Sequence, residues 1–415
     1  MKNARLIAFE VLDSVFKDGA YSNIAVDKAL DGVDSKNKAF VSSLVYGVCE
    51  RKITLDYLLE QHLTTKPKRK VMLLLYIGAY QLYFMDKVPD SAAINTAVEL
   101  AGEVGLGYYK KLINAVLRKV DGNRVDINKI EDLSVRFSCP EHLINMWNKM
   151  YGAENTLSIL SAINGKPPVF AVPNTLYVTA DELLYELQNC GINGEVIGGV
   201  VRITSAFDLS NCKPFVDGLF HIEDLSSFTC ATALDVQQGD TVIDFCSAPG
   251  GKTFTLAEFM NNTGTVYAYD LYPHRVKLID DGAKRLGLTK VVAAVNDACE
   301  HSENVPLADR ILCDVPCSGF GIIRRKPEIR YKDLDSIKEL PEIQYRILTT
   351  SAEYLKQGGR IVYSTCTLNK RENEKVVQRF IDEQSGYKLL YDKTIFPTAD
   401  GGDGFYYAVI EKTDD

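Results

Sequence analysis

Two cysteines each follow a short apolar run, and this setting suggests nucleophilic chemistry. Cys317 lies in the segment 314–319, after the apolar run 311–313, and Cys366 lies after the run 360–363. Runs of this kind predict buried strands of a parallel sheet, whose carboxyl ends carry the ligand sites of open α/β folds. A thiolate is a soft nucleophile, and its addition to carbon 6 of a pyrimidine makes carbon 5 reactive. The sequence therefore predicts one sheet edge that carries two thiols.

A third predicted strand, 241–245, leads into a glycine-rich turn at 246–253. This turn has neither the Gly-Lys-Ser/Thr ending of a phosphate-binding loop nor the Gly-x-Gly-x-x-Gly pattern of dinucleotide sites. Its proline and glycines would let backbone N–H groups approach a carboxylate. Methyltransferases hold S-adenosylmethionine in this way. A nicotinamide cofactor is less favoured, because the loop that would bind its diphosphate is missing.

Two acidic residues follow the next predicted strands. Asp270 closes the strand 266–270, about 20 residues beyond the glycines, a position that suits a ribose diol. A helix N-cap is the structural alternative. Asp297 follows the strand 291–295, where it could reach an adenine amine. A lone cysteine after a strand is usually a small buried hydrophobe, and Cys299 and Cys313 are interpreted in that way.

The composition is that of an ordinary globular chain. It has 415 residues, 46% hydrophobic and 25% charged, which is enough for two to four domains. The longest apolar stretch, 71–85, is too short to span a bilayer, and the N-terminus lacks the apolar core of a signal peptide. Ten cysteines without paired spacing and only five histidines predict reduced thiols, a cytoplasmic location and no metal site.

The net charge of −8 argues against a protein that coats nucleic acid without sequence preference. It does not exclude a specific RNA enzyme, because binding depends on local basic surface. Basic residues cluster at 66–70, 110–119 and 324–332. A solvated helix face is favoured for the first two clusters, whereas the third follows the Cys317 loop directly and favours substrate contact. The candidate RNA contacts are Lys68, Arg69, Arg324, Arg325 and Lys326.

The chain divides into segments with different patterns. Residues 1–125 show helical spacing of apolar residues without strand alternation, which predicts an all-α bundle, and 126–165 continue as a helical linker. Residues 166–225 predict a small α/β domain. From 226 to 415 strands and helices alternate, which predicts a doubly wound parallel sheet.

Together these motifs resemble the bacterial 16S ribosomal RNA (cytosine-5)-methyltransferases of the RsmB/Sun (Fmu) family, over nearly the whole chain. The resemblance rests on the catalytic motifs 246–253, 314–319 and 364–367 with Glu372-Asn373, and on the subfamily segments 321–329 and 403–406. The helical N-terminus, with 18–23 and 44–47, resembles the RNA-binding antitermination factor NusB. The resemblance implies a NusB-like bundle, a small middle domain and a Rossmann-like methyltransferase domain.

The family's residue roles transfer by matching position. Cys366 would be the nucleophile, and Cys317 would help release the product. Asp314 would hold the flipped base, since such chemistry needs the base out of its stack. The residues that would bind S-adenosylmethionine are Cys246, Ser247, Ala248, Pro249, Gly250, Gly251, Lys252, Asp270, Asp297 and Asp314.

The implied substrate is 16S ribosomal RNA, naked or in an early assembly particle, and the implied enzyme is a monomer that needs no metal or membrane. Two alternatives stay open: a tRNA cytosine-5 methyltransferase, and an inactive RNA-binding or antitermination module. The intact pair of cysteines argues against the second. Two positions depart from the family pattern, because Ala171 stands in place of an arginine and Glu223-Asp224 in place of Gln-Asp.

Overall fold

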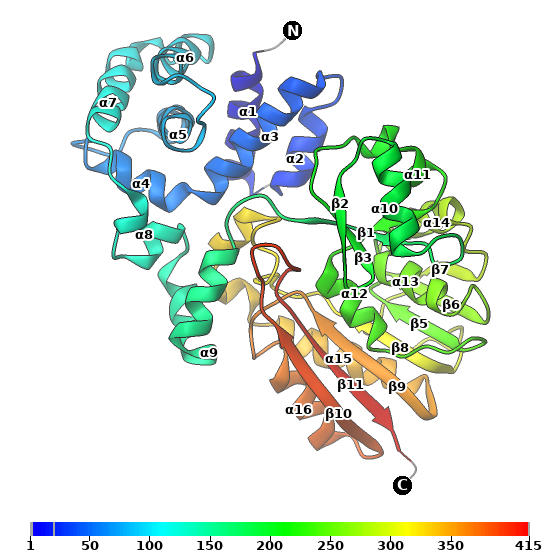
Figure 1. The fold of residues 1–415 in the computed structure, drawn as a ribbon. Coiled ribbons are helices and arrows are strands. Elements are labelled where there is room, and N and C mark those ends of the chain that lie inside the picture. Colours follow the sequence, from blue (N-terminus) through cyan, green and yellow to red (C-terminus); the bar gives the residue numbers. More distant parts are fainter. Residues whose placement is uncertain (1–2, 20, 414–415) are drawn as a thin grey trace. The chain divides into compact units, whose positions relative to one another are not determined.

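The computed structural model describes residues 3–19 and 21–413. By their contacts these residues form two compact units. Unit 1 comprises the chain up to Lys166 together with Ile323–Lys332, and unit 2 comprises Pro167–Ile322 and the chain from Asp333 onward. Figure 1 labels their elements. The boundaries predicted at 125, 165 and 225 stay predictions.

Unit 1 is helical, as the apolar spacing predicted. In α7, Ile113, Val116, Leu117 and Val120 repeat every three or four residues and are all buried, so that one helix face packs into the core. The helices are α1 (Ala4–Asp18), α2 (Ser22–Ala29), α3 (Ser35–Glu50), α4 (Lys52–Glu60), α5 (Arg69–Phe84), α6 (Asp90–Glu103), α7 (Lys110–Gly122), α8 (Leu133–Phe137) and α9 (Glu141–Ala162), with short 3-10 turns at Gly107–Tyr109 (η1) and Ile127–Lys129 (η2).

The segment Ile323–Lys332 belongs to unit 1 although the chain before and after it belongs to unit 2. Its 3-10 turn η4 (Pro327–Tyr331) carries Arg330, which is fully buried. The guanidinium donates to the carbonyl oxygens of Glu50 at 3.0 Å, Ser138 at 2.9 Å and Ile163 at 3.2 Å. Nearby, Ser22 donates from Oγ to the Glu328 carboxylate at 2.6 Å.

This burial corrects one sequence-based interpretation. Arg330 lies in the basic cluster 324–332, for which substrate contact was favoured. Its donors instead hold unit 1 together, and none of its surface is exposed. A cluster of basic residues in the sequence does not show whether an arginine lies on the surface or donates hydrogen bonds to buried carbonyl groups.

Unit 2 begins with a small domain. Among the described residues it has a four-stranded antiparallel sheet in the order β2-β3-β1-β4. Gly198 and Gly199 form the β2–β3 turn with positive φ angles of 58° and 87°. Ala171 is fully buried in this domain's core. The elements are β1 (Val169–Pro173), α10 (Ala180–Asn189), β2 (Gly194–Ile197), β3 (Val200–Ile203), η3 (Leu209–Asn211), α11 (Lys213–Val216) and β4 (Phe220–Ile222).

The rest of unit 2 confirms the predicted Rossmann-like fold. Its described residues form a seven-stranded sheet in the order β10-β11-β9-β8-β5-β6-β7. Strands β5 to β9 are parallel, as predicted, but β10 and β11 pair antiparallel at one edge. The elements are α12 (Leu225–Thr232), β5 (Thr241–Phe245), α13 (Gly251–Phe259), β6 (Thr265–Asp270), α14 (Pro273–Leu286), β7 (Val291–Val295), β8 (Ala308–Asp314), η5 (Leu334–Ile337), α15 (Leu340–Glu353), β9 (Leu355–Thr365), α16 (Glu374–Glu383), β10 (Tyr387–Ile395) and β11 (Phe405–Lys412).

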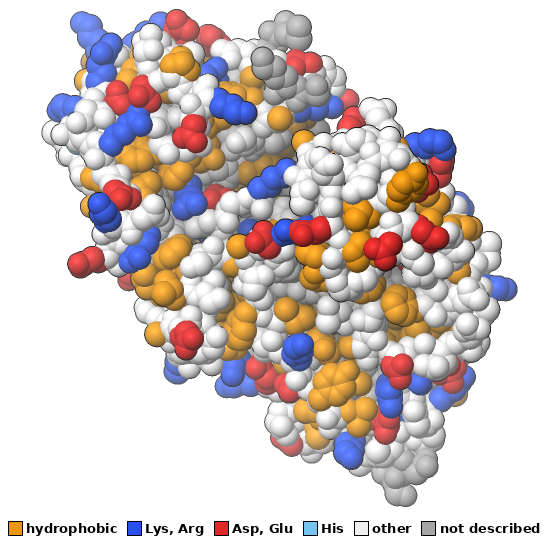
Figure 2. Space-filling view, in the orientation of Figure 1, with side chains coloured by type: hydrophobic (Ala, Val, Ile, Leu, Met, Phe, Trp, Pro, Cys, Tyr) orange, Lys and Arg blue, Asp and Glu red, His pale blue; other side chains and the backbone are white. Residues whose placement is uncertain are grey.

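The surface in Figure 2 mixes lysine and arginine with acidic side chains. No helix that the structure describes is both long and apolar enough to cross a membrane. Within residues 3–19 and 21–413 there is also no group of three or more His, Cys, Asp or Glu side chains that could hold a metal ion.

A buried polar cluster connects β4 to α13. His221 lies 3.4 Å from the carboxylates of both Glu223 and Glu258, and Thr255 donates to Glu223 at 2.7 Å. Burial alone lowers the pKa of His221, but the two carboxylates outweigh burial and raise the pKa to about 9. The histidine is therefore charged at neutral pH.

We expect this histidine to make the stability of unit 2 depend on pH. Because its folded pKa lies above its unfolded value of about 6.5, its contribution is complete below that pH and is lost as pH rises through 9. The loss should reach about 1–3 kcal/mol of unfolding free energy. Urea titrations at pH 6.5 and 9.5 would measure it. A His221→Gln variant with the same pH dependence as the parent would contradict this assignment.

Candidate active site

The two predicted thiols meet at the carboxyl ends of β8 and β9. The strands pair in parallel with Asp314 opposite Ser364, so the segments that follow leave the same edge of the sheet. The sulfur atoms of Cys317 and Cys366 lie 3.2 Å apart, and both residues are free thiols of intermediate exposure. This separation is hydrogen-bonding contact, well beyond the length of a disulfide bond.

The contact between the two sulfurs affects the acidity of Cys317. The hydrogen bond to Cys366, followed by burial, raises the pKa of Cys317 well above its ordinary value. Either sulfur can be the donor of the hydrogen bond between them. The arrangement places two thiols in hydrogen-bonding contact at one edge of the sheet.

Glu372 holds both cysteine segments in place, and it is fully buried. Its carboxylate accepts hydrogen bonds from the backbone N–H of Ser318 at 2.8 Å and the Ser318 hydroxyl at 2.6 Å. Gln344 at 3.1 Å and Asn369 at 2.7 Å complete its shell. The sequence pointed to Glu372 only as part of a motif, and its spacing gave no indication of this role.

Further hydrogen bonds join the segment after Cys317 to the segment after Cys366. The Ser318 and Thr367 hydroxyl oxygens lie 2.7 Å apart, and the N–H of Gly321 donates to the carbonyl of Cys366 at 3.0 Å. Asn373 receives a hydrogen bond from Thr365 at 2.6 Å and donates to the carbonyl of Thr367 at 2.9 Å. Two loops that are tied at this many points can hold their thiols at a fixed distance.

The glycine-rich turn follows β5 and ends at the start of α13. Gly250 is the N-cap with φ 111°, and a Cβ there would lie 2.4 Å from the Phe254 ring, so that only glycine fits. Ser247 donates from N–H and from Oγ to the carbonyl of Tyr269, each at 2.9 Å. Thr253 ties α13 back to β5 through a 2.5 Å hydrogen bond to Asp244. Burial raises the pKa of the Cys246 thiol well above its ordinary value.

Asp270 ends β6 beside this turn and is 2% exposed. It accepts hydrogen bonds from the N–H of Ala248 at 3.3 Å and of Tyr272 at 3.2 Å, and Arg275 lies 3.2 Å away. A carboxylate has about four acceptor sites, and these partners use three of them. Binding both hydroxyls of a ribose would therefore require the half-exposed Arg275 side chain to release one oxygen.

Asp314 connects the glycine-rich turn to the thiols. Its carboxylate accepts from Lys252 at 2.8 Å and from Ser364 at 2.8 Å. Burial lowers the pKa of Lys252, but the carboxylates of Asp314 and Glu223 outweigh burial and raise it. Lys252 is thus a fixed positive charge at the start of α13. Ser364 was selected from the sequence only as part of the motif 364–367, and Gln344 was not selected.

The remaining candidates are placed as follows. Asp297 is exposed after β7 and accepts from the N–H of Cys299 at 2.9 Å. In unit 1, Lys68 is exposed, Arg69 forms an ion pair with Asp13, and the ammonium of Lys326 lies 5.8 Å from the centre of the Tyr21 ring. Arg324 is only 6% exposed and Arg325 is half-buried. RNA contact by these five basic residues stays a prediction.

Comparison with known proteins gives two family matches. Residues 231–411 match the family described as 16S rRNA methyltransferase RsmB/F, and residues 2–122 match the NusB family. The chain is 36% identical to a probable ribosomal RNA small subunit methyltransferase B of Bacillus subtilis, with 99% of each chain covered. It is 30% identical to the ribosomal RNA small subunit methyltransferase B of Photorhabdus laumondii, again with 99% of each covered.

Solved structures show the same architecture. The crystal structure of PH0851 superposes with a TM-score of 0.82 at 25% identity and covers 99% of both chains. A methyltransferase homologue from Pyrococcus horikoshii gives a TM-score of 0.61 at 28% identity, covering 68% of this chain and 98% of that one. These similarities agree with the Rossmann-like domain and its cofactor turn.

Proposed function

Because this chain belongs to the 16S rRNA methyltransferase RsmB/F family, we propose that it methylates carbon 5 of a cytosine in small-subunit ribosomal RNA. The methyl donor is S-adenosylmethionine, and the covalent nucleophile is Cys366. The observation that carries the proposal is the pair of thiols 3.2 Å apart beyond β8 and β9. Methyl transfer to oxygen or nitrogen would need no second thiol at that place.

The residues of the turn fit S-adenosylmethionine. Backbone N–H groups at the start of α13 suit its carboxylate, because the helix begins at a glycine with no side-chain cap. Asp270 suits the ribose, and Asp297 suits the adenine amine. Cys246, Ser247, Ala248, Pro249 and Gly251 would line the same site. When bound, the cofactor supplies an electrophilic methyl group.

The first chemical step belongs to Cys366. Its sulfur forms a bond to carbon 6 of the target cytosine, and the electrons of the 5,6 double bond become available at carbon 5 for the methyl group. Asp314, which Lys252 and Ser364 hold at 2.8 Å, would accept a hydrogen bond from the exocyclic amine of the base. A hydrogen bond donated by Cys317 would favour negative charge on the attacking sulfur.

The second step belongs to Cys317. Once Cys366 is bonded to carbon, its sulfur is a thioether and can no longer donate a hydrogen bond to Cys317. Cys317, after losing its own thiol proton to solvent, would accept the proton from carbon 5. As that proton leaves, the double bond re-forms and the bond from carbon 6 to the sulfur of Cys366 breaks.

Asp270→Ala is expected to weaken S-adenosylmethionine by about tenfold or more, because hydrogen bonds to a charged acceptor contribute about 1.5–3 kcal/mol. Isothermal titration calorimetry measures the change. Asp281→Ala, on the outer part of α14, removes an exposed carboxylate and serves as the matched control. If folded Asp270→Ala protein binds S-adenosylmethionine with an unchanged Kd, Asp270 stabilises the glycine-rich turn and does not bind the cofactor.

Bisulfite sequencing of ribosomal and transfer RNA from a deletion strain tests the proposed reaction. In the deletion strain we expect one cytosine of 16S ribosomal RNA to become sensitive to bisulfite conversion. The wild-type gene should restore its resistance to bisulfite, and a Cys366→Ala gene should not. Loss of resistance in tRNA would favour the tRNA enzyme instead. If no site in either pool changes, the chain is an RNA-binding or antitermination module without this activity.

A further inference from the structure

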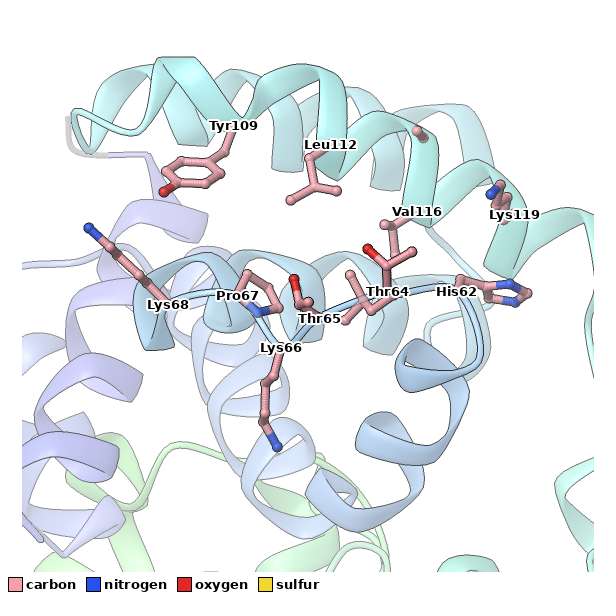
Figure 3. A pocket seen from close by; sticks show the side chains of 12 residues that line it. His62, Thr64, Thr65, Lys66, Pro67, Lys68, Tyr109, Leu112, Val116 and Lys119 are labelled. Carbon is pink, nitrogen blue, oxygen red and sulfur yellow. The ribbon is translucent and has the colours of Figure 1, made fainter.

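A cavity in unit 1 brings together two of the basic clusters that are far apart in sequence. Its volume is about 500 Å³, which lies within the range of small-ligand sites. One wall is the loop from His62 to Lys68, between α4 and α5, and the other is Tyr109 with the first three turns of α7. Figure 3 shows these walls facing each other.

The cavity is positive at both ends. Lys68 lies beside Tyr109 at one end, and Lys119 lies beside His62 at the other (Figure 3). Neither lysine forms an ion pair with any residue that the structure describes, and none of the described residues that line the cavity is acidic. Lys66 differs, because it points away from α7 and pairs with Glu60 at 3.2 Å. Two unpaired lysines thus flank the cavity.

Two helices also begin at the Lys68 end. Lys68 is the N-cap of α5 and Tyr109 the N-cap of α7, and neither makes a side-chain capping hydrogen bond. Neither first turn contains an acidic residue. The positive ends of two helix dipoles are therefore added to the charge of Lys68. Both features favour an anion there.

Between the two lysines the floor is apolar, with Leu112, Ala115 and Val116 on α7 and Pro67 opposite. Tyr108, next to this end of the cavity, is 94% exposed and packs edge-on against Tyr109 with ring centres 5.5 Å apart. An aromatic ring presented to solvent beside lysines is the arrangement on which unpaired nucleic-acid bases stack.

We propose that this cavity binds a single-stranded segment of the substrate RNA, with phosphates at Lys68 and Lys119 and a base stacked on Tyr108. Tyr109 and Lys119 are ten residues apart, or about 15 Å along α7, so the segment spans a few nucleotides. Duplex RNA does not present free base faces that could stack on Tyr108. This inference rests on the proposed function only in taking RNA as the substrate.

The test measures binding of a labelled single-stranded RNA of about 16 nucleotides to the full chain. Lys68→Ala/Lys119→Ala is expected to weaken the Kd by about fivefold to tenfold and to lower the slope of log K against log salt by about 1.4, or 0.7 per phosphate. Tyr108→Ala should weaken the Kd about tenfold without changing that slope. S-adenosylmethionine affinity should be unchanged in every variant.

Lys87→Ala/Lys149→Ala is the matched control, because both lysines are exposed in unit 1 and neither lines the cavity. An equal loss in this control, or an unchanged Kd and salt slope in the cavity variants, would overturn the inference. If the cavity binds a protein instead of RNA, the cavity variants should bind RNA with an unchanged Kd, which would also overturn the inference. Cytosine methylation is scored separately. Variants that methylate with wild-type KM would refute the cavity site alone, whereas wild-type protein that binds RNA here without methylating it would refute the proposed function alone.

Discussion

Cys366→Ala protein is expected to lose methyl transfer by about a thousandfold or more and to form no covalent complex with RNA. Cys317→Ala protein should form the complex and fail to release it, so that RNA-bound enzyme survives denaturing electrophoresis. Both expectations follow from the 3.2 Å contact, which places a second thiol beside the sulfur that attacks. One thiol can start the reaction and the other can end it.

The measurement is a denaturing gel with labelled substrate RNA and S-adenosylmethionine. Cys190→Ala is the matched control, since Cys190 is a free thiol exposed on the small domain and its loss should change neither turnover nor trapping. If Cys317 were the nucleophile, the two catalytic variants would exchange their behaviour. A covalent RNA complex of the Cys366→Ala protein would therefore refute the assignment of Cys366 as the nucleophile. Full turnover by both variants would show that the two cysteines serve only in packing.

The sequence predicted those parts of the fold that local patterns determine. The strands 241–245 and 291–295 have the predicted bounds, because each is a continuous apolar run between turn residues. β5 is buried within the sheet, whereas β7 is its edge strand and has no buried residue. The antiparallel edge of the sheet, formed by β10 and β11, was not predicted. β10 has one partly buried face and many exposed residues, so no apolar run marks it or its antiparallel pairing with β11.

The parts of the active site that the sequence did not predict depend on hydrogen bonds between residues that are far apart in the chain. The roles of Glu372 and Gln344 depend on hydrogen bonds to residues 54 and 28 positions away. Residue type and spacing could place both thiols near one sheet edge, but only the folded loops bring the sulfurs into contact. The same limit applies to Arg330, whose basic neighbours suggested a surface that the structure does not provide.

Arg330→Ala is expected to destabilise unit 1 by about 3–5 kcal/mol, the range for breaking a buried charged network. The substitution leaves the carbonyls of Glu50, Ser138 and Ile163 without their donor in a site that is closed to water. Each such group costs about 1–3 kcal/mol when it stays buried. Arg330→Lys should recover only a part, because an ammonium has three donors and lacks the planar fork that reaches several carbonyls.

Trp147 provides the measurement. It is the only tryptophan in the chain, and it is fully buried in α9, so its fluorescence reports the unfolding of unit 1. Arg118→Ala is the matched control, because Arg118 is exposed on α7 and its hydrogen bond to Asn114 lies within the same helix. A urea midpoint in Arg330→Ala equal to that of the control would mean that the segment 323–332 is not held by this arginine. A lower midpoint would show that the segment 323–332, which starts six residues after Cys317, contributes to the stability of the helical unit through one buried guanidinium.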